Sequence, residues 1–299
     1  MSTHRTVRSR REFLATLAAG SFIPGFLSRM IARTQAGEGE ADREICETIL
    51  ARGKKEQHDA LPMGALVALI GRNFMERPYR GGTLEEPGEE HLVVNLREFD
   101  CVSFVESSVA LARAVKKGCT AAEGFRTELQ TLRYRDGKIN GYPSRLHYFT
   151  DWIADNAARN NVLDVTGELG GVEDHRPVTF MTQHREAYPR LVRDDVFNAV
   201  GESERLLTGR RRCVLPRTRV AAALPALRDG DIIGIATSRA GLDCSHTGLV
   251  AVEGGVAKFL HAPLSGGHVQ ISRGSLADYM DGHEAQTGIV VARPLDPVT

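Results

Sequence analysis

The first half of the chain shows a helical spacing of its hydrophobic residues. Apolar positions recur every three or four residues, which places them on one face of an α-helix. This spacing predicts helices over Ala41–Leu50, Gly64–Phe74 and Cys101–Val115. Asp100 directly precedes the last of these segments, where an N-cap carboxylate is favoured. We therefore expect that helix to begin at Cys101.

Capping patterns indicate two more helices. Thr120-Ala121-Ala122-Glu123 reads as a capping box that opens a helix to about Leu132. Ser144 is placed to cap another helix that runs through to Asn156. A loop rich in Gly, Pro and Glu is expected over Pro78–Glu90, ahead of the Cys101 helix.

The second half changes to the short apolar and alternating runs that are typical of β-strands. Turns such as Glu253-Gly254-Gly255 separate these runs. The expected strands are Asp231–Thr237, Thr247–Val252, Val256–His261, Val269–Ser272 and Gly288–Arg293. Helices followed by a meander of strands predict an α+β fold, with a helical first half packed on an antiparallel sheet. We expect residues 37–299 to form one domain.

The N-terminus has the layout of an export signal. A basic stretch ending in Arg10-Arg11 precedes the apolar run Phe13–Leu27. The string around the two arginines resembles a twin-arginine signal, so we expect residues 1–36 to be removed and the mature protein to work in the periplasm. The apolar run is short for a membrane span, and none is expected after cleavage. A basic amphipathic helix is the alternative interpretation.

Composition excludes several classes of function. The 38 basic and 38 acidic side chains balance, which argues against nucleic acid as a partner. The five cysteines are odd in number and show no C-x-x-C spacing, so neither a disulfide framework nor a zinc site is indicated. No cofactor motif is present, and we expect neither a metal nor a cofactor.

The predicted start of a helix makes Cys101 a candidate nucleophile. A helix N-terminus carries partial positive charge, which stabilises a thiolate and lowers the pKa of a cysteine. His246 opens a predicted strand far downstream, at the separation of roughly 130–150 residues that papain-like enzymes show. His261 ends the next strand, and antiparallel neighbours can bring the two histidines together. The hypothesis is Cys101 as nucleophile, His246 as base and His261 as its orienting group.

Each of these residues alone is commonly structural, since a helical cysteine or a strand histidine often belongs to a core. Their order along the chain is more specific, and with it the sequence resembles a known family. The similarity is to the NlpC-type papain-like cell-wall hydrolases, and within them to the N-acetylmuramoyl-L-alanine amidase-like branch. The motifs are Phe99-Asp100-Cys101-Val102-Ser103-Phe104-Val105-Glu106, Gly141-Tyr142-Pro143-Ser144-Arg145-Leu146-His147-Tyr148-Phe149, Phe180-Met181-Thr182-x-His184, Gly230-Asp231, His246-x-Gly248 and His261-Ala262.

The resemblance implies a papain-like fold and hydrolysis of the amide between N-acetylmuramic acid and L-alanine in peptidoglycan fragments. It also carries the Cys-His-His triad of the superfamily onto Cys101, His246 and His261. Arginine suits a peptide carboxylate and tyrosine suits a sugar face. The expected substrate contacts are Tyr79, Asp100, Ser103, Tyr142, Arg145 and His147.

One departure from the superfamily favours the amidase. Endopeptidases of this fold usually have serine after the cysteine and a tyrosine shortly upstream, whereas Val102 and Glu89 stand at the corresponding positions. The alternatives are a γ-D-glutamyl-diaminopimelate endopeptidase, a non-catalytic cell-wall-binding protein, and an acyltransferase or thioester lipid hydrolase. The expected partner is a muropeptide or peptidoglycan fragment, and the expected state is a monomer.

Overall fold

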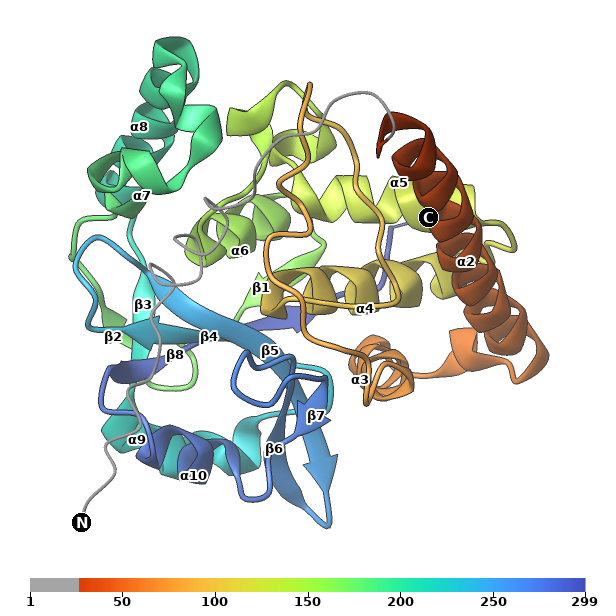
Figure 1. Ribbon diagram of the computed structural model, residues 1–299. Coiled ribbons are helices and arrows are strands. Elements are labelled where there is room, and N and C mark those ends of the chain that lie inside the picture. Colours follow the sequence, from red (N-terminus) through yellow and green to blue (C-terminus); the bar gives the residue numbers. More distant parts are fainter. Residues whose placement is uncertain (1–26, 299) are drawn as a thin grey trace, which may run out of the picture.

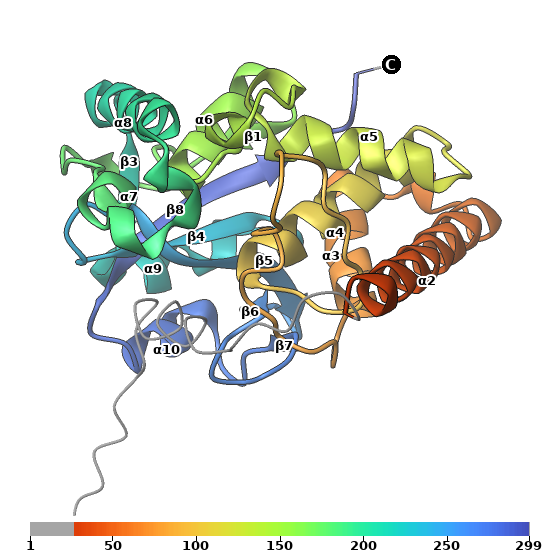
Figure 2. The ribbon, with the colours of Figure 1, turned by 45° about the horizontal axis from the view of Figure 1, so that its top comes forward.

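The computed structural model describes residues 27–298. The export signal expected at residues 1–36 therefore lies largely outside the described residues and stays a prediction. The first described element is α2 (Leu27–Lys55), a long helix that includes the helix predicted over Ala41–Leu50. Figures 1 and 2 show α2 at the opposite end of the molecule from α8 (Asp194–Gly209).

The helical first half is confirmed. Its remaining α-helices are α3 (Met63–Asn73), α4 (Cys101–Lys116), α5 (Ala122–Arg133) and α6 (Phe149–Ala158). Two predicted caps are wrong. α5 begins after Ala121 without any side-chain cap, so the pattern at Thr120 forms no capping box. α6 begins after Tyr148, because Ser144 lies in a separate 3₁₀ turn where its hydroxyl bonds the carbonyl of Gly141.

The second half forms a mixed arrangement of strands and shorter helices. The strands are β1 (Val162–Asp164), β2 (Val172–Glu173), β3 (Cys213–Pro216), β4 (Ile232–Thr237), β5 (Cys244–Glu253), β6 (Val256–His261), β7 (Gln270–Ile271) and β8 (Gln286–Pro294). The other α-helices are α7 (Phe180–Gln183), α8, α9 (Arg217–Ala223) and α10 (Leu276–Asp281). The 3₁₀ turns are η2 (His58–Ala60), η3 (Arg135–Gly137), η4 (Tyr142–Ser144), η5 (Arg185–Ala187), η6 (Pro189–Val192) and η7 (Leu224–Ala226).

All strand pairs in this sheet are antiparallel, as the sequence predicted. The order is β2-β3-β8-β4-β5-β6-β7, and β1 pairs with β8. Strands β4 to β7 form the expected meander. The last strand is the exception, because β8 returns to lie between β3 and β4 and pairs with both.

Each face of the sheet is covered by its own helices. Figure 1 shows α3, α4 and α6 on one side of the sheet, with α9 and α10 on the other. Neighbouring residues of β5 alternate between the two faces: Leu249 packs with Phe104 of α4, whereas Val250 belongs to the cluster that holds Leu276 and Met280 of α10. The sheet is therefore the middle layer, and the start of α4 lies on its first face.

A third apolar cluster surrounds α7 and α8, two helices that were not predicted from the sequence. It contains Tyr148, Phe180, Leu191 and Leu207. Arg190 fastens this region to the loop before α4 by hydrogen bonds to the carbonyl oxygens of Glu86 and Gly88. The segment is thus tied to the rest of the domain.

Candidate active site

Cys101 is the first residue of α4, as predicted. Asp100 is the N-cap, and its carboxylate accepts the backbone N–H of Ser103 at 2.7 Å. The hydroxyl of Ser103 in turn accepts the backbone N–H of Asp100 at 3.0 Å, which completes a capping box. The first turn contains no acidic side chain apart from this cap, so the positive end of the helix is directed at Cys101.

The capping box gives Asp100 and Ser103 a structural part. The Ser103 side chain is buried and makes its hydrogen bonds within the cap. The substrate contacts expected of these two residues from the sequence stay predictions. Their observed work is to hold the helix start on which Cys101 stands.

His246 and Cys101 line the same small cavity. Its volume is about 30 Å³, and Val102, His147 and Cys244 also contribute to its walls. Such a space holds about one water molecule. Two residues far apart in the sequence are therefore brought to one pocket, at the place where α4 meets the start of β5.

A β-bulge in β5 makes the side chains of Cys244 and His246 point in different directions. Ile235 of β4 pairs with His246, but its neighbour Ala236 pairs with Cys244, so Ser245 is an extra residue. Cys244 consequently packs into the cluster beneath α4. His246 points toward Phe259 and His261, and it still lines the cavity beside Cys101.

His261 lies next to His246. Nε2 of His246 lies 2.7 Å from Nδ1 of His261. Gly248 stands directly opposite His261 in the β5–β6 ladder. A Cβ on Gly248 would come within 2.9 Å of the Cβ of His261 and 2.7 Å of the Leu260 carbonyl oxygen. Glycine at this position therefore gives the imidazole of His261 its space.

His261 is held in its neutral form. Burial, with smaller effects of the nearby His246 and His283, lowers its pKa to about 2. A neutral His261 can accept at Nδ1 the N–H that His246 carries on Nε2. In that arrangement Nδ1 of His246 carries the lone pair of the ring, and it can take up the proton of a thiol as His246 becomes imidazolium.

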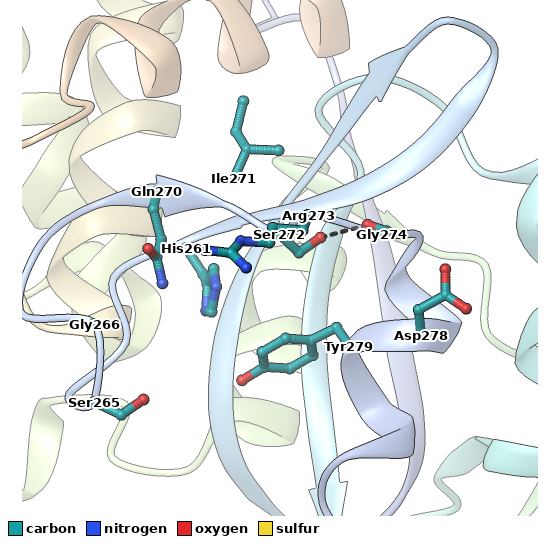
Figure 3. Close-up of a pocket in the computed structure, with 10 residues that line it drawn as sticks. All are labelled: His261, Ser265, Gly266, Gln270, Ile271, Ser272, Arg273, Gly274, Asp278 and Tyr279. Carbon is teal, nitrogen blue, oxygen red and sulfur yellow. Dashed lines mark hydrogen bonds between the residues drawn. The ribbon is translucent and has the colours of Figure 1, made fainter.

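His261 also lines a larger pocket. Its volume is about 470 Å³, and Gln270, Arg273, Asp278 and Tyr279 lie around it with His261 (Figure 3). The ring of Tyr279 packs edge-on against His261, with 4.9 Å between the ring centres. Tyr279 could not be found from sequence patterns, because it lies on the six-residue helix α10 and reaches the histidines only through the tertiary fold.

Tyr79 is brought close to the helix start. Its backbone pairs with that of Phe99 in a parallel bridge, two residues before Cys101. Arg80 then donates its N–H to the Phe99 carbonyl oxygen at 2.9 Å. The residue expected from the sequence to contact substrate is thus placed beside the site by the loop, and its contact with substrate stays a prediction.

Arg145 and Tyr142 have partners inside the protein. The guanidinium of Arg145 is buried, grips both carboxylate oxygens of Glu90 at 2.9 Å, and reaches Glu85 at 2.8 Å. It also lies over the ring of Tyr142, whose side chain is buried as well. Neither residue lines the two pockets described above. Their observed role is to fasten the loop before α4, and substrate contact stays a prediction.

His147 does line the Cys101 cavity. Burial and the nearby charge of Arg145 lower its pKa to about 3, so the ring is neutral. Its Nε2 lies 2.9 Å from the carbonyl oxygen of Tyr142 and must donate there. His147 therefore offers a neutral wall to the cavity rather than a cation.

Cys244 shares the cavity but differs from Cys101 in its surroundings. Burial raises the pKa of the Cys244 thiol well above its ordinary value, and Asp243 adds to the shift. A protonated, buried thiol is a poor nucleophile. Within the described residues, no disulfide joins any of the five cysteines.

Two further features bear on function. Among residues 27–298, no group of three or more His, Cys, Asp or Glu side chains is arranged to hold a metal ion. None of the helices in this described part has the length and apolar character needed to cross a bilayer.

Comparison with known proteins gives this geometry a context. Residues 69–289 match the model of the AmiA-like, N-acetylmuramoyl-L-alanine amidase-like family. A solved N-acetylmuramoyl-L-alanine amidase from Bacteroides uniformis is 33% identical, with a TM-score of 0.74 over 78% of this chain and 98% of that one. A search of curated proteins found no match.

Two other solved structures share the fold. A Bacteroides fragilis protein, provisionally named a xylanase, is 34% identical with a TM-score of 0.71 over 75% of this chain and 99% of that one. A Legionella pneumophila protein is 20% identical with a TM-score of 0.66 over 88% of this chain and 98% of that one. The family match and the amidase neighbour support a cell-wall amidase. The chain belongs to the N-acetylmuramoyl-L-alanine amidase-like family.

Proposed function

We propose that this protein is a cysteine-dependent amidase that hydrolyses the bond between the lactyl group of N-acetylmuramic acid and L-alanine in peptidoglycan fragments. One observation carries the mechanism: Cys101, at the start of α4, shares a cavity with His246, and His246 is hydrogen-bonded to His261. This is the arrangement of nucleophile, base and orienting group that acyl transfer requires.

In the first half-reaction, Nδ1 of His246 takes the proton of the Cys101 thiol. The thiolate attacks the lactyl carbonyl carbon, and the carbonyl electrons move onto oxygen. In this mechanism the backbone N–H of Cys101, in the first turn of α4, donates to that oxyanion. The imidazolium of His246 then protonates the leaving nitrogen, so the peptide departs with L-alanine at its N-terminus and a thioester remains.

In the second half-reaction, water attacks the thioester. His246 accepts a proton from the water, and the tetrahedral intermediate collapses with departure of the Cys101 thiolate. The imidazolium of His246 returns the proton to the sulfur, and the muramyl product leaves as a carboxylic acid that ionises in water. His261 keeps the His246 ring in one orientation throughout, because its own low pKa leaves a lone pair on Nδ1. The same pair of histidines therefore serves both steps.

The substrate assignment is supported by family membership and by the name of the Bacteroides uniformis neighbour. We infer the same bond for this chain, and we place it in the NlpC-type papain-like class on the motifs around Cys101, His246 and His261. Val102 follows the nucleophile where the endopeptidases of that class have serine. The endopeptidase is accordingly the second candidate, with cleavage after D-glutamate.

The name of the Bacteroides fragilis neighbour suggests glycoside hydrolysis as an alternative activity. That reaction needs a pair of carboxylates that are available to the substrate. Two aspartates line the pockets, Asp243 beside Cys101 and Asp278 beside His261. Asp243 accepts hydrogen bonds from Thr150 and from the backbone N–H of Cys244. Asp278 caps α10 through Ser275. Both carboxylates are thus engaged in holding the backbone, which favours the amidase.

The cellular setting is part of the proposal. We propose that residues 1–36 direct export and that the mature protein acts as a monomer on wall fragments in the periplasm. A fusion of residues 1–36 to a reporter enzyme tests this. Reporter activity in the periplasmic fraction, lost on replacing Arg10 and Arg11 by lysine, supports twin-arginine export, and cytoplasmic retention of the unaltered fusion contradicts it.

The bond is tested by incubating the mature protein with a disaccharide tetrapeptide muropeptide and weighing the products by mass spectrometry. The proposal predicts free disaccharide and an intact peptide that begins with L-alanine. A disaccharide that keeps L-alanyl-D-glutamate, with release of the rest of the stem, would establish the endopeptidase instead. Binding without any product would establish a wall-binding protein.

A further inference from the structure

Tyr279 stands at the boundary between the histidine pair and the larger pocket. Figure 3 shows its ring extending from α10 toward His261, along one wall of the pocket. The ring centre lies 4.9 Å from that of His261 and 6.5 Å from that of His246. Phe259 packs against both histidines and against Tyr279, so the three rings are held by a common buried partner. Tyr279 therefore lies beside both histidines of the proposed site.

The proposed amidase mechanism leaves this residue unused. Building on the proposed function, we propose that the Tyr279 hydroxyl donates a hydrogen bond to the oxyanion that forms on the substrate carbonyl when Cys101 attacks it. Gln286 positions the Tyr279 hydroxyl for this bond. Tyr279 is then a catalytic residue that acts alongside the Cys101 N–H. Gln286 is a positioning residue that acts through Tyr279.

The electrostatics of the phenol fit a donor. Burial raises the pKa of Tyr279 to about 12, a hydrogen bond from the side chain of Gln286 opposes the shift, and the Cys101 thiolate raises it. The first and last effects keep the hydroxyl protonated at neutral pH. Cys101 is thus close enough to act on the charge of the phenol, and the oxyanion forms on the substrate carbonyl that becomes bonded to the Cys101 sulfur.

Gln286 gives a second, independent sign of function. Its side chain is 8% exposed, and its Oε1 has no hydrogen-bond partner in the described structure. An unsatisfied buried oxygen is destabilising, and an apolar side chain of similar size would avoid that cost. A glutamine at this position is explained if its amide N–H donates a hydrogen bond to the Tyr279 oxygen. The proton of the Tyr279 hydroxyl is then available for another acceptor.

The test is Tyr279→Phe, which removes only the hydroxyl and keeps the ring against His261. We expect kcat to fall about 100-fold, as for loss of one oxyanion donor, with KM within about two-fold of wild type. The rate at which iodoacetamide alkylates Cys101, followed against pH, should match the wild-type profile because no oxyanion forms in that reaction. Tyr134→Phe is the matched control, since its hydroxyl bonds Glu90 and the His91 carbonyl away from both pockets.

Two results would overturn the role of Tyr279. An unchanged kcat would show that the hydroxyl takes no part, and an alkylation profile that shifts together with kcat would show that it acts on the Cys–His pair instead. The kcat values of wild type and Tyr279→Phe are compared on whichever wall fragment the wild type hydrolyses. The test of Tyr279 is therefore valid even where the bond assigned above is wrong. Absence of turnover of any amide by wild type would instead reject the proposed function and, with it, the oxyanion role.

Gln286→Leu tests the positioning role. It should lower kcat less than Tyr279→Phe does, without loss of thermal stability, because the orphaned oxygen is removed as well. The double variant Tyr279→Phe, Gln286→Leu should be no slower than Tyr279→Phe alone. Additive losses in the double variant would show that Gln286 does not work through Tyr279.

Discussion

Nε2 of His246 and Nδ1 of His261 lie 2.7 Å apart across the neighbouring strands β5 and β6. Replacing His261 should therefore act on the orientation of His246. His261→Gln keeps an acceptor within reach of His246, whereas His261→Leu removes it. We expect kcat for peptide release to fall about 100-fold or more in the leucine variant and less in the glutamine variant. Equal activity in both variants would mean that the acceptor at residue 261 is not used.

Substitution of Gly248 should also disturb the hydrogen-bonded pair of His246 and His261. Gly248→Ala would put a Cβ 2.7 Å from the Leu260 carbonyl oxygen, and backbone atoms of a central strand cannot move aside easily. We expect a loss of about 1–3 kcal/mol in the free energy of unfolding together with a large fall in kcat. Gly39→Ala is the control, because a Cβ at that position meets nothing within 4 Å. Chemical denaturation and turnover of the two variants check this, and a fully active Gly248→Ala protein would refute the packing argument.

The buried histidines predict a pH dependence of stability. The pKa is lowered to about 3 in His147 and to about 2 in His261, below the ordinary value of 6.5. Below pH 6.5 the unfolded chain therefore binds protons that the folded chain rejects, and stability falls as pH falls toward 3. Each group adds a slope that approaches about 1.4 kcal/mol per pH unit.

Urea denaturation between pH 7 and pH 4 measures this slope. His261→Gln should make it shallower, whereas His175→Gln should leave it unchanged because the His175 side chain is 81% exposed. A slope that is the same in wild type and in His261→Gln would show that His261 is not held neutral by the fold.

The Arg145→Ala variant distinguishes a structural role of Arg145 from a role in substrate binding. Arg145→Ala leaves the buried carboxylate of Glu90 without its bidentate partner, so we expect a loss of about 3–5 kcal/mol in the free energy of unfolding. Arg205→Ala removes an exposed pair with Glu202 and should leave the free energy of unfolding nearly unchanged. Thermal and urea unfolding provide the comparison. A stable Arg145→Ala protein with a raised KM would restore the substrate contact expected from the sequence.

The sequence predicted the elements whose hydrophobic period is regular. α3, α4 and β6 match their predicted segments to within about two residues at each end. β5 begins earlier than predicted, because the bulge at Ser245 breaks the alternation on which a strand prediction depends. α8 was missed; it has no side-chain cap at its start and contains Gly201.

The candidate site was predictable where chemistry follows from local position. Cys101 could be found because Asp100 marks a helix start, and His246 and His261 because they bound predicted strands. Tyr279 could not, since only the packing of α10 on β6 brings it to the pair. The partners of Arg145 were equally hidden, because Glu85 and Glu90 lie in an irregular loop with no periodicity to place them.

Turnover by Cys101→Ala tests the central claim most directly. The variant removes one sulfur atom from a helix start whose cap is left intact, so its far-UV circular dichroism and melting temperature should match wild type. Release of the L-alanyl peptide from a muropeptide should fall to background, while Cys244→Ala, which alters the other thiol of the same cavity, should retain turnover. Peptide release by Cys101→Ala at the wild-type rate would contradict the assignment of Cys101 as the nucleophile.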